Sequence, residues 1–149
     1  MELMIDNNIV LDHILDREPH AEKSRLVCLL GITGEAQTFI SVNMLTDIFY
    51  VLRKAHGSQR AQEILGDELS FLRWVGVSSE DAKLALAKKW PDFEDALVAE
   101  CAGKINADYI VTRDGKDFAR SPIKAVSPEE LFEILEAEGL HYEEALLDL

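Results

Sequence analysis

Short apolar runs alternate along this chain with longer stretches whose apolar residues recur at helical spacing. The runs at residues 3–6, 38–41, 74–77, 108–112 and 123–126 indicate buried strands, and helical patterns separate the first four. Strands joined through helices form right-handed crossovers and pair in parallel. The alternation therefore predicts an α/β sandwich built on a mainly parallel central sheet.

Breakers and caps predict where the helices begin and end. Gly31 and Gly57 are expected to end two of them, and Ser58 to begin the next. Asp92 is expected to cap another helix, with Asp95 at its third position in an arrangement like a capping box. The helices are expected over residues 7–15, 21–30, 43–55, 58–72, 79–87 and 92–105, and a last one follows Ser127.

Size and composition predict one cytoplasmic domain over residues 1–149. The 48% content of hydrophobic residues excludes a disordered chain, and no apolar run approaches the roughly 18 residues that span a bilayer. Glu2 and Asp6 stand where a secretory signal needs positive charge, so no export is expected. Cys28 and Cys101 lie in helix-like apolar stretches and indicate buried free thiols, which suit a reducing compartment.

The net charge of −13 lowers the expectation of a nucleic-acid substrate without excluding it. Eight acids and no Lys or Arg fall within residues 129–149, and the rest of the chain carries 20 acids against 15 bases. The tail from about residue 139 is acidic and amphipathic, and a solvated face is its simplest interpretation.

Four aspartates stand where strands end or strand-following helices begin. They are Asp6, Asp47, Asp95 and Asp114. The carboxyl ends of parallel strands and the starts of the next helices meet at one edge of such a sheet. Carboxylates gathered there repel one another, and a divalent cation is the usual remedy. Two such ions activate water and stabilise the leaving oxygen in phosphodiester hydrolysis. The pattern predicts a magnesium-dependent phosphodiesterase.

Each acid also has a structural interpretation. Asp92 and Asp95 could serve only as helix caps, and Asp114, before a glycine, could serve as a turn residue. Asp47 could be solvated on its helix. Two further acids, Asp12 and Asp16, are interpreted as surface residues of the first helix.

Five segments in order resemble the PIN-domain nucleases. Met4–Asp12 resembles the opening Asp-containing motif of that family, and Thr46–Lys54 its second acidic helix. Asp92–Leu97 and Ala107–Phe118 resemble the third and fourth motifs, and Ser121–Leu131 the last strand and helix. The resemblance covers about residues 1–135.

This resemblance implies a three-layer, Rossmann-like sandwich and a metal-dependent nuclease that prefers single strands. Many members are ribonuclease toxins of VapBC-type toxin–antitoxin pairs. The family therefore implies Mg²⁺ or Mn²⁺ as cofactor, single-stranded RNA as substrate, a possible antitoxin as partner and a homodimer. Carried over by position, the catalytic and metal-binding residues are Asp6, Asp47, Asp95 and Asp114.

Other positions follow from the same resemblance. Asn8 would orient Asp6 or a metal-bound water, Thr112 would hydrogen-bond near the site, and Asp117 is a candidate fifth acid. Asp92 is a further supporting residue. The chain departs from the family at Asn7, where a hydroxyl residue is usual, and at Asp47, where many members carry the longer Glu. Glu94 adds to the negative charge of the third motif.

Basic and aromatic residues near these motifs suggest contacts with RNA. Arg113 and Lys116 flank Asp114 and are the expected phosphate ligands. Trp90, which follows two lysines, either stacks on a base or packs under its loop.

Three alternative functions are open to the same residues. A HAD-like phosphatase also ends its first strand with Asp but needs a second Asp where this chain has Asn8. A receiver-like phosphoacceptor needs an acidic pair before Asp6, which is missing. The non-enzymatic alternative is a catalytically weak PIN-like module that binds RNA or a protein partner without cutting.

Overall fold

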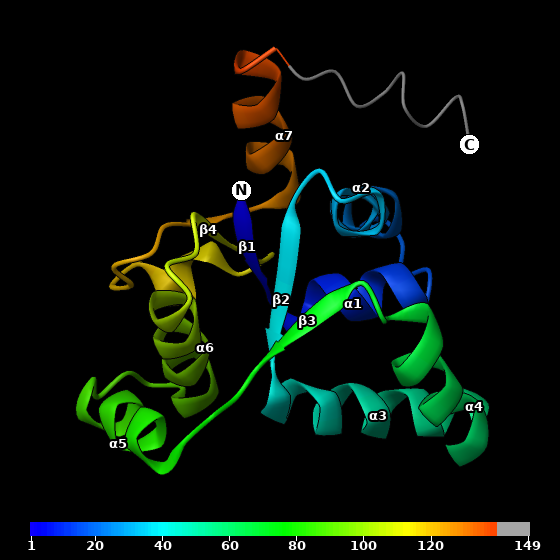
Figure 1. The fold of residues 1–149 in the computed structure, drawn as a ribbon, viewed down its shortest axis with the longest axis horizontal. Helices are drawn as coiled ribbons and strands as arrows, with labels where there is room; N and C mark the ends of the chain where they lie inside the picture. The colour runs from blue at the N-terminus through cyan, green and yellow to red at the C-terminus, as the bar shows by residue number, and fades with distance from the viewer. Residues whose placement is uncertain (140–149) are drawn as a thin grey trace.

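A five-stranded, wholly parallel sheet forms the centre of the molecule. The computed structural model describes residues 1–139, and the acidic tail expected from about residue 139 lies outside them. The strands are β1 (Glu2–Ile5), β2 (Gln37–Ser41), β3 (Leu72–Val75), β4 (Tyr109–Val111) and β5 (Ala125–Val126). They lie in the order β3-β2-β1-β4-β5, with every neighbouring pair parallel (Figure 1). The predicted parallel α/β fold is confirmed.

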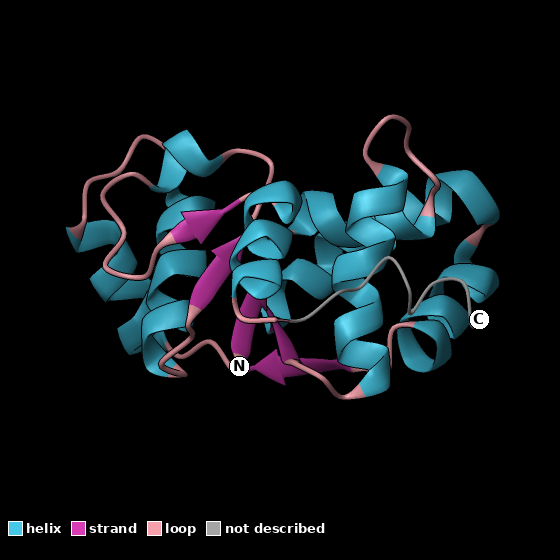
Figure 2. Ribbon diagram, turned by 90° about the horizontal axis from the view of Figure 1, so that it is seen from above, coloured by secondary structure: helices cyan, strands magenta, loops and turns pink. Residues whose placement is uncertain are grey.

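Helices cover both sides of this sheet (Figures 1 and 2). They are α1 (Asn7–Ile14), α2 (Ala21–Thr33), α3 (Val42–His56), α4 (Ser58–Glu63), α5 (Ser79–Ala87), α6 (Phe93–Lys104) and α7 (Pro128–Ala137). A π-helical turn, η1 (Ile64–Glu68), follows α4, and a 3-10 turn, η2 (Gly115–Phe118), follows β4. No helix among residues 1–139 is long and apolar enough to cross a bilayer.

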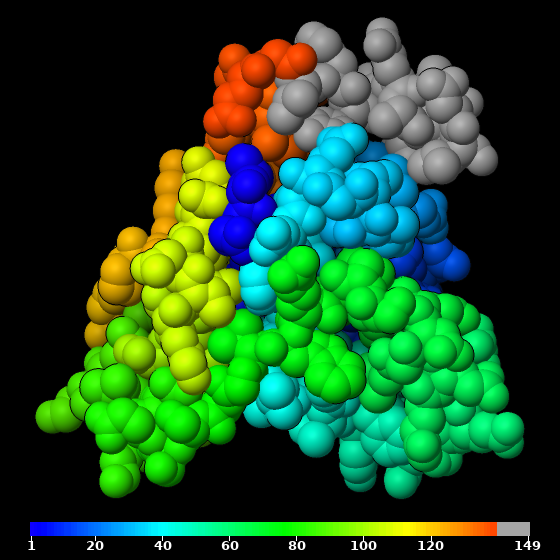
Figure 3. All heavy atoms as spheres, in the orientation of Figure 1, coloured from blue at the N-terminus to red at the C-terminus, as the bar shows by residue number. Residues whose placement is uncertain are grey.

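The core is formed around the central strand. Leu3, Met4 and Ile5 of β1 are at most 1% exposed, as are Ile110 and Val111 of β4. In the space-filling view the first residues of the chain reach the surface only as a narrow strip between their neighbours (Figure 3). Because apolar residues enclose β1, a charge placed directly after it is held at the rim of the core.

The predicted thiols are indeed free and buried. Cys28 lies on α2 and Cys101 on α6. Burial raises the pKa of Cys28 to about 12 and that of Cys101 to about 11. Both cysteines therefore serve as small core residues and not as nucleophiles.

Side-chain caps begin several helices at the predicted places. Ser78 and Ser127 each form a complete capping box, the first with Asp81 and the second with Glu130. Asp92 caps α6 by accepting a hydrogen bond from the backbone N–H of Asp95 at 3.1 Å.

Two predicted helix ends are wrong. The second helix runs through Gly31 and ends at Gly34, whose φ of +79° suits a left-handed cap. Gly31 serves a close approach instead, because a Cβ there would overlap Thr38 Oγ1 on β2. In place of the helix predicted over 58–72, α4 ends at Glu63 and the π-helical turn η1 continues from it to Glu68. Leu72 already belongs to β3, which starts two residues before the predicted strand.

Candidate functional site

The site starts from the register of β1 and β4. Ile5 lies beside Val111, so the residues that follow the two strands emerge together at their carboxyl ends. The Thr112 hydroxyl, wholly buried, donates to Asp6 Oδ2 at 2.8 Å and accepts from the Asp114 backbone N–H at 3.0 Å. One hydroxyl thus fixes both the carboxylate after β1 and the backbone of the loop after β4.

Asp6 also begins the first helix. Its Oδ1 accepts a hydrogen bond from the Asn7 backbone N–H at 2.8 Å, and this bond caps α1. Burial raises the pKa of Asp6 above its usual value, and the charges of Asp114 and Asp92 raise it further. The hydrogen bonds from Thr112 and Asn7 oppose that rise. Two hydrogen bonds therefore hold the Asp6 carboxyl in place, although burial disfavours its charged form.

Two consecutive asparagines connect α1 to the other acidic segments. Asn8 Nδ2 donates to Asp114 Oδ2 at 3.1 Å, so Asn8 holds the acid after β4. Asn7 Nδ2 donates to Glu94 Oε1 at 3.2 Å. The Oδ1 atoms of both side chains are buried without a hydrogen-bond partner among the described residues. The first turn of α1 therefore positions two acids from other segments, Glu94 and Asp114, through the amide nitrogens of its asparagines. The amide oxygens of the same asparagines accept no hydrogen bond from the described residues.

The first turn of α6 carries the most perturbed acids. The pKa of Asp95 is raised to about 7, first by burial and then by the charges of Asp92, Asp6, Asp117 and Asp114. These causes show that acids from three segments share one electrostatic environment.

Glu94 belongs to the same environment. Its pKa is raised to about 7 by burial, by the charge of Asp47 and by a hydrogen bond to it, and then by Asp92 and Asp6. Glu94 thus links the acid of α3 to the rest of the cluster. We call these acids, taken together, the acidic cluster: Asp6, Asp47, Asp92, Glu94, Asp95, Asp114 and Asp117.

The structure therefore brings all four predicted aspartates to one edge of the sheet, with the supporting Asp92 and Asp117 beside them. The sequence indicates Glu94 only as added negative charge, whereas the structure places it within the site. Its position between Asp92 and Asp95, in the first turn of α6, was the available signal. Asp47 itself is exposed and interacts with the cluster through Glu94.

The donor set suits a hydrated divalent ion better than a closed cage. Within residues 1–139, no three His, Cys, Asp or Glu side chains lie close enough to enclose a metal directly. Mg²⁺ prefers oxygen ligands, keeps several waters and needs only one or two carboxylates. Carboxyl groups that repel one another and resist ionisation, as Asp6 and Asp95 do, are what a cation neutralises. The residues present therefore fit such an ion.

One predicted basic ligand is engaged in an ion pair. Arg113 Nε donates to Asp12 Oδ2 at 2.6 Å, and Arg113 Nη2 donates to Asp12 Oδ1 at 3.2 Å. Asp12 is wholly buried, so its assignment to the surface is wrong. The bidentate guanidinium compensates the buried charge. Asp16 is exposed and pairs with Arg25, in agreement with its assignment to the surface.

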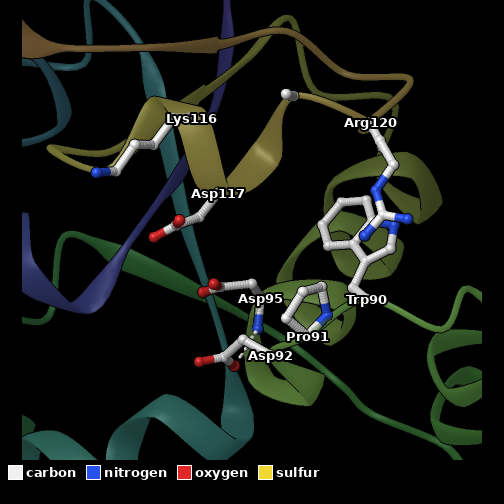
Figure 4. A pocket seen from close by; sticks show the side chains of 8 residues that line it. Trp90, Pro91, Asp92, Asp95, Lys116, Asp117 and Arg120 are labelled. Carbon is white, nitrogen blue, oxygen red and sulfur yellow. Dashed lines mark hydrogen bonds between the residues drawn. The ribbon is translucent and has the colours of Figure 1, made fainter.

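A pocket of about 280 Å³ opens beside the acidic cluster (Figure 4). Asp92, Asp95 and Asp117 turn their carboxylates toward one side of it, and Trp90 and Arg120 lie together at the other. The lining residues are Trp90, Pro91, Asp92, Asp95, Lys116, Asp117, Ala119 and Arg120. Lys116, one of the two predicted phosphate ligands, thus borders the cluster.

The fold and this edge define an α/β domain with an acidic centre at the carboxyl ends of parallel strands. The sequence model of the PIN domain matches residues 2–116, and the chain belongs to the PIN-domain family.

Solved structures share the fold. VapBC2 from Rickettsia felis, bound to a promoter DNA fragment, aligns with a TM-score of 0.63 at 23% identity, over 85% of this chain and 98% of its own. A toxin–antitoxin complex from Klebsiella pneumoniae gives 0.65 at 22% identity, over 85% and 97%. VapC20 of Mycobacterium tuberculosis, a toxin that cleaves the sarcin-ricin loop, gives 0.62 at 14% identity, over 79% and 94%. No curated protein sequence matches the chain.

Proposed function

We propose that this protein is a divalent-metal-dependent endoribonuclease that hydrolyses phosphodiester bonds of single-stranded RNA. The observation that carries the proposal is the acidic cluster, in which the pKa of Asp95 is raised to about 7 by burial and then by neighbouring carboxylates. Keeping such charges together is costly unless a cation is bound. Membership of the PIN-domain family supports the same activity.

Each residue has a role in this proposal. Asp6, Asp95 and Asp114 would hold a hydrated Mg²⁺ or Mn²⁺, in part through its waters, and the shorter Asp47 would act through water together with Glu94. A bound ion would lower the pKa of a water and neutralise the charge that develops on the phosphate oxygens.

The remaining residues position these acids and the RNA. Thr112 fixes Asp6 against the loop that carries Asp114, and Asn8 orients Asp114. Lys116 contacts a backbone phosphate at the rim. Arg113, paired with Asp12, acts on RNA only through the exposed third of its side chain.

We further propose that the protein is a cytoplasmic toxin that forms a homodimer and is neutralised by an antitoxin. The support is the fold shared with toxin–antitoxin complexes from Rickettsia felis and Klebsiella pneumoniae. An antitoxin segment with a basic side chain would complement the acidic cluster.

Cleavage of an end-labelled single-stranded RNA by the full chain tests the nuclease. Cleavage is expected with Mg²⁺ or Mn²⁺ and not with EDTA. Asp95→Asn and Asp114→Asn are each expected to slow it about 100-fold or more, because each removes several kcal/mol of charge stabilisation in the transition state. Asp67→Asn, an exposed acid of η1 outside the cluster, is the matched control and should leave the rate unchanged.

The same assay separates the alternatives. Hydrolysis of a phosphate monoester with the RNA left intact would favour a HAD-like phosphatase. RNA or Mn²⁺ binding without any cleavage would favour a catalytically weak module that binds RNA or a protein partner.

A further inference from the structure

We propose that the pocket beside the acidic cluster is a nucleobase subsite, in which a base of the RNA stacks on the indole of Trp90. The inference rests on the proposed function for its substrate class. It goes further by assigning a place for a base, where the cluster accounts only for the phosphodiester.

The indole is held firmly at the back of the pocket. Its ring meets the buried Phe118 edge-on, with the centroids 6.2 Å apart and the planes at 83°. The loop before it is fixed by an ion pair between Lys88 Nζ and Glu100 Oε1 at 2.9 Å. Lys89 has a φ of +56°, an uncommon value for a residue with a side chain. Trp90 is thus half-buried and anchored by its contact with Phe118, as a stacking platform must be.

The face of the indole already carries a flat polar group. The guanidinium carbon of Arg120 lies 5.9 Å from the ring centroid, and the two side chains overlap in Figure 4. Arg120 is exposed and forms no ion pair within residues 1–139. A base can therefore take its place on the indole while the guanidinium moves to the outer side of the base. Aromatic rings and arginine planes are the usual partners of unpaired bases.

The charges of the pocket select a neutral ring over a second phosphate. Asp92, Asp95 and Asp117 line it together with only two cations, Lys116 and Arg120. An anion placed against these carboxylates would be repelled, whereas a base carries no charge and has polar edges that hydrogen-bond to them.

The pocket is also contiguous with the proposed reaction centre. Asp95 belongs to both, and Asp92 caps the helix that carries it. A strand with its phosphate at the acidic cluster would place the base of an adjoining nucleotide over Trp90.

Tryptophan fluorescence tests this directly, because the chain has only two tryptophans. Trp74 lies on β3, 57% exposed and outside the pocket, so Trp74→Phe leaves Trp90 as the single reporter. Asp6→Asn is added to prevent cleavage. The probes are a single-stranded RNA hexanucleotide and an abasic strand of the same length, each titrated in Mg²⁺. Emission of Trp90 and anisotropy of the labelled strand are followed together.

We expect the RNA to quench Trp90 as it binds, and the abasic strand to leave the emission unchanged. Trp90→Ala should weaken binding of the hexanucleotide roughly 5- to 150-fold, the usual value of one stacked base. Trp90→Phe keeps an aromatic face and should recover most of that loss. If Trp90→Ala fails to fold, Arg120→Ala leaves the core intact and should weaken binding about 2- to 30-fold.

Three results would overturn the subsite: bound RNA that leaves the emission unchanged, equal quenching by the abasic strand, or no RNA binding at all. Cleavage by the wild-type chain is measured separately. Cleavage without quenching would remove the subsite and leave the nuclease, whereas quenching without cleavage would do the reverse.

Discussion

Replacing Asp95 by Asn should stabilise the metal-free protein at alkaline pH and have less effect in acid. The pKa of this carboxyl is raised from 3.8 to about 7 in the folded state. Its ionisation therefore costs the folded state nothing below pH 3.8, an increasing amount as the pH rises toward 7, and the full amount above 7. An amide of the same shape escapes that cost.

The size of the effect follows from the two pKa values. The pKa rises from 3.8 to about 7, and at about 1.4 kcal/mol per pH unit this rise corresponds to a cost of about 4 kcal/mol for ionising Asp95 in the folded state. Asp95 is only half-buried, and water and salt screen the repulsion, so we expect a stabilisation of about 1–2 kcal/mol at pH 8. At pH 4, close to the usual pKa of 3.8, less than half of this should remain.

Urea unfolding of the full chain at pH 4 and pH 8, in EDTA, measures the difference. Asp67→Asn, exposed and outside the acidic cluster, is the control, and its difference in stability from the wild type should be the same at both pH values. Added Mg²⁺ should stabilise the wild type and reverse the advantage of the variant at pH 8. A variant that is equally or less stable than the wild type at both pH values, in EDTA, would refute the electrostatic reasoning.

Three further changes have expected outcomes in unfolding and cleavage assays. Thr112→Val removes the hydroxyl between two site segments, so it should cost about 1–3 kcal/mol and slow cleavage of RNA, whereas Thr112→Ser should restore both. Asp12→Ala should cost up to about 3 kcal/mol because it leaves a partly buried guanidinium unpaired, and Asp16→Ala, at an exposed pair, under about 1 kcal/mol. Gly31→Ala should destabilise by about 1–3 kcal/mol through overlap with β2, and Gly103→Ala, on open α6, should stabilise slightly.

The sheet and the edge that carries the acids were predictable from local pattern. A buried run that ends in Asp6 can only place that charge at the rim of a core. The position of Asp92, three residues before Asp95, predicts the capping bond that the structure shows. Such signals depend on neighbours a few residues away, and they are sufficient to predict that the strands pair in parallel, although not the order in which they lie.

Long-range partners explain what was missed. Asp12 is buried because Arg113, 101 residues later, reaches it, and no local pattern carries that information. The close approach of Gly31 to Thr38 likewise depends on how α2 packs on β2. Glu94 lies in the same helical turn as Asp95, which does not by itself show that both face the site. Its contacts with Asn7 of α1 and with Asp47 of α3 show that it does, and both partners are distant in the sequence.

The capping bonds of Asp6 and Asp92 affect how activity should be inferred in other members of the family. Each side chain begins a helix, so selection for stability alone would retain Asp or Asn at these two positions after catalysis was lost. The side chains of Asp95 and Asp114 form no capping bond. Retention of acids at the second pair is therefore the more informative sign of a working nuclease, and an inactive descendant should lose those first.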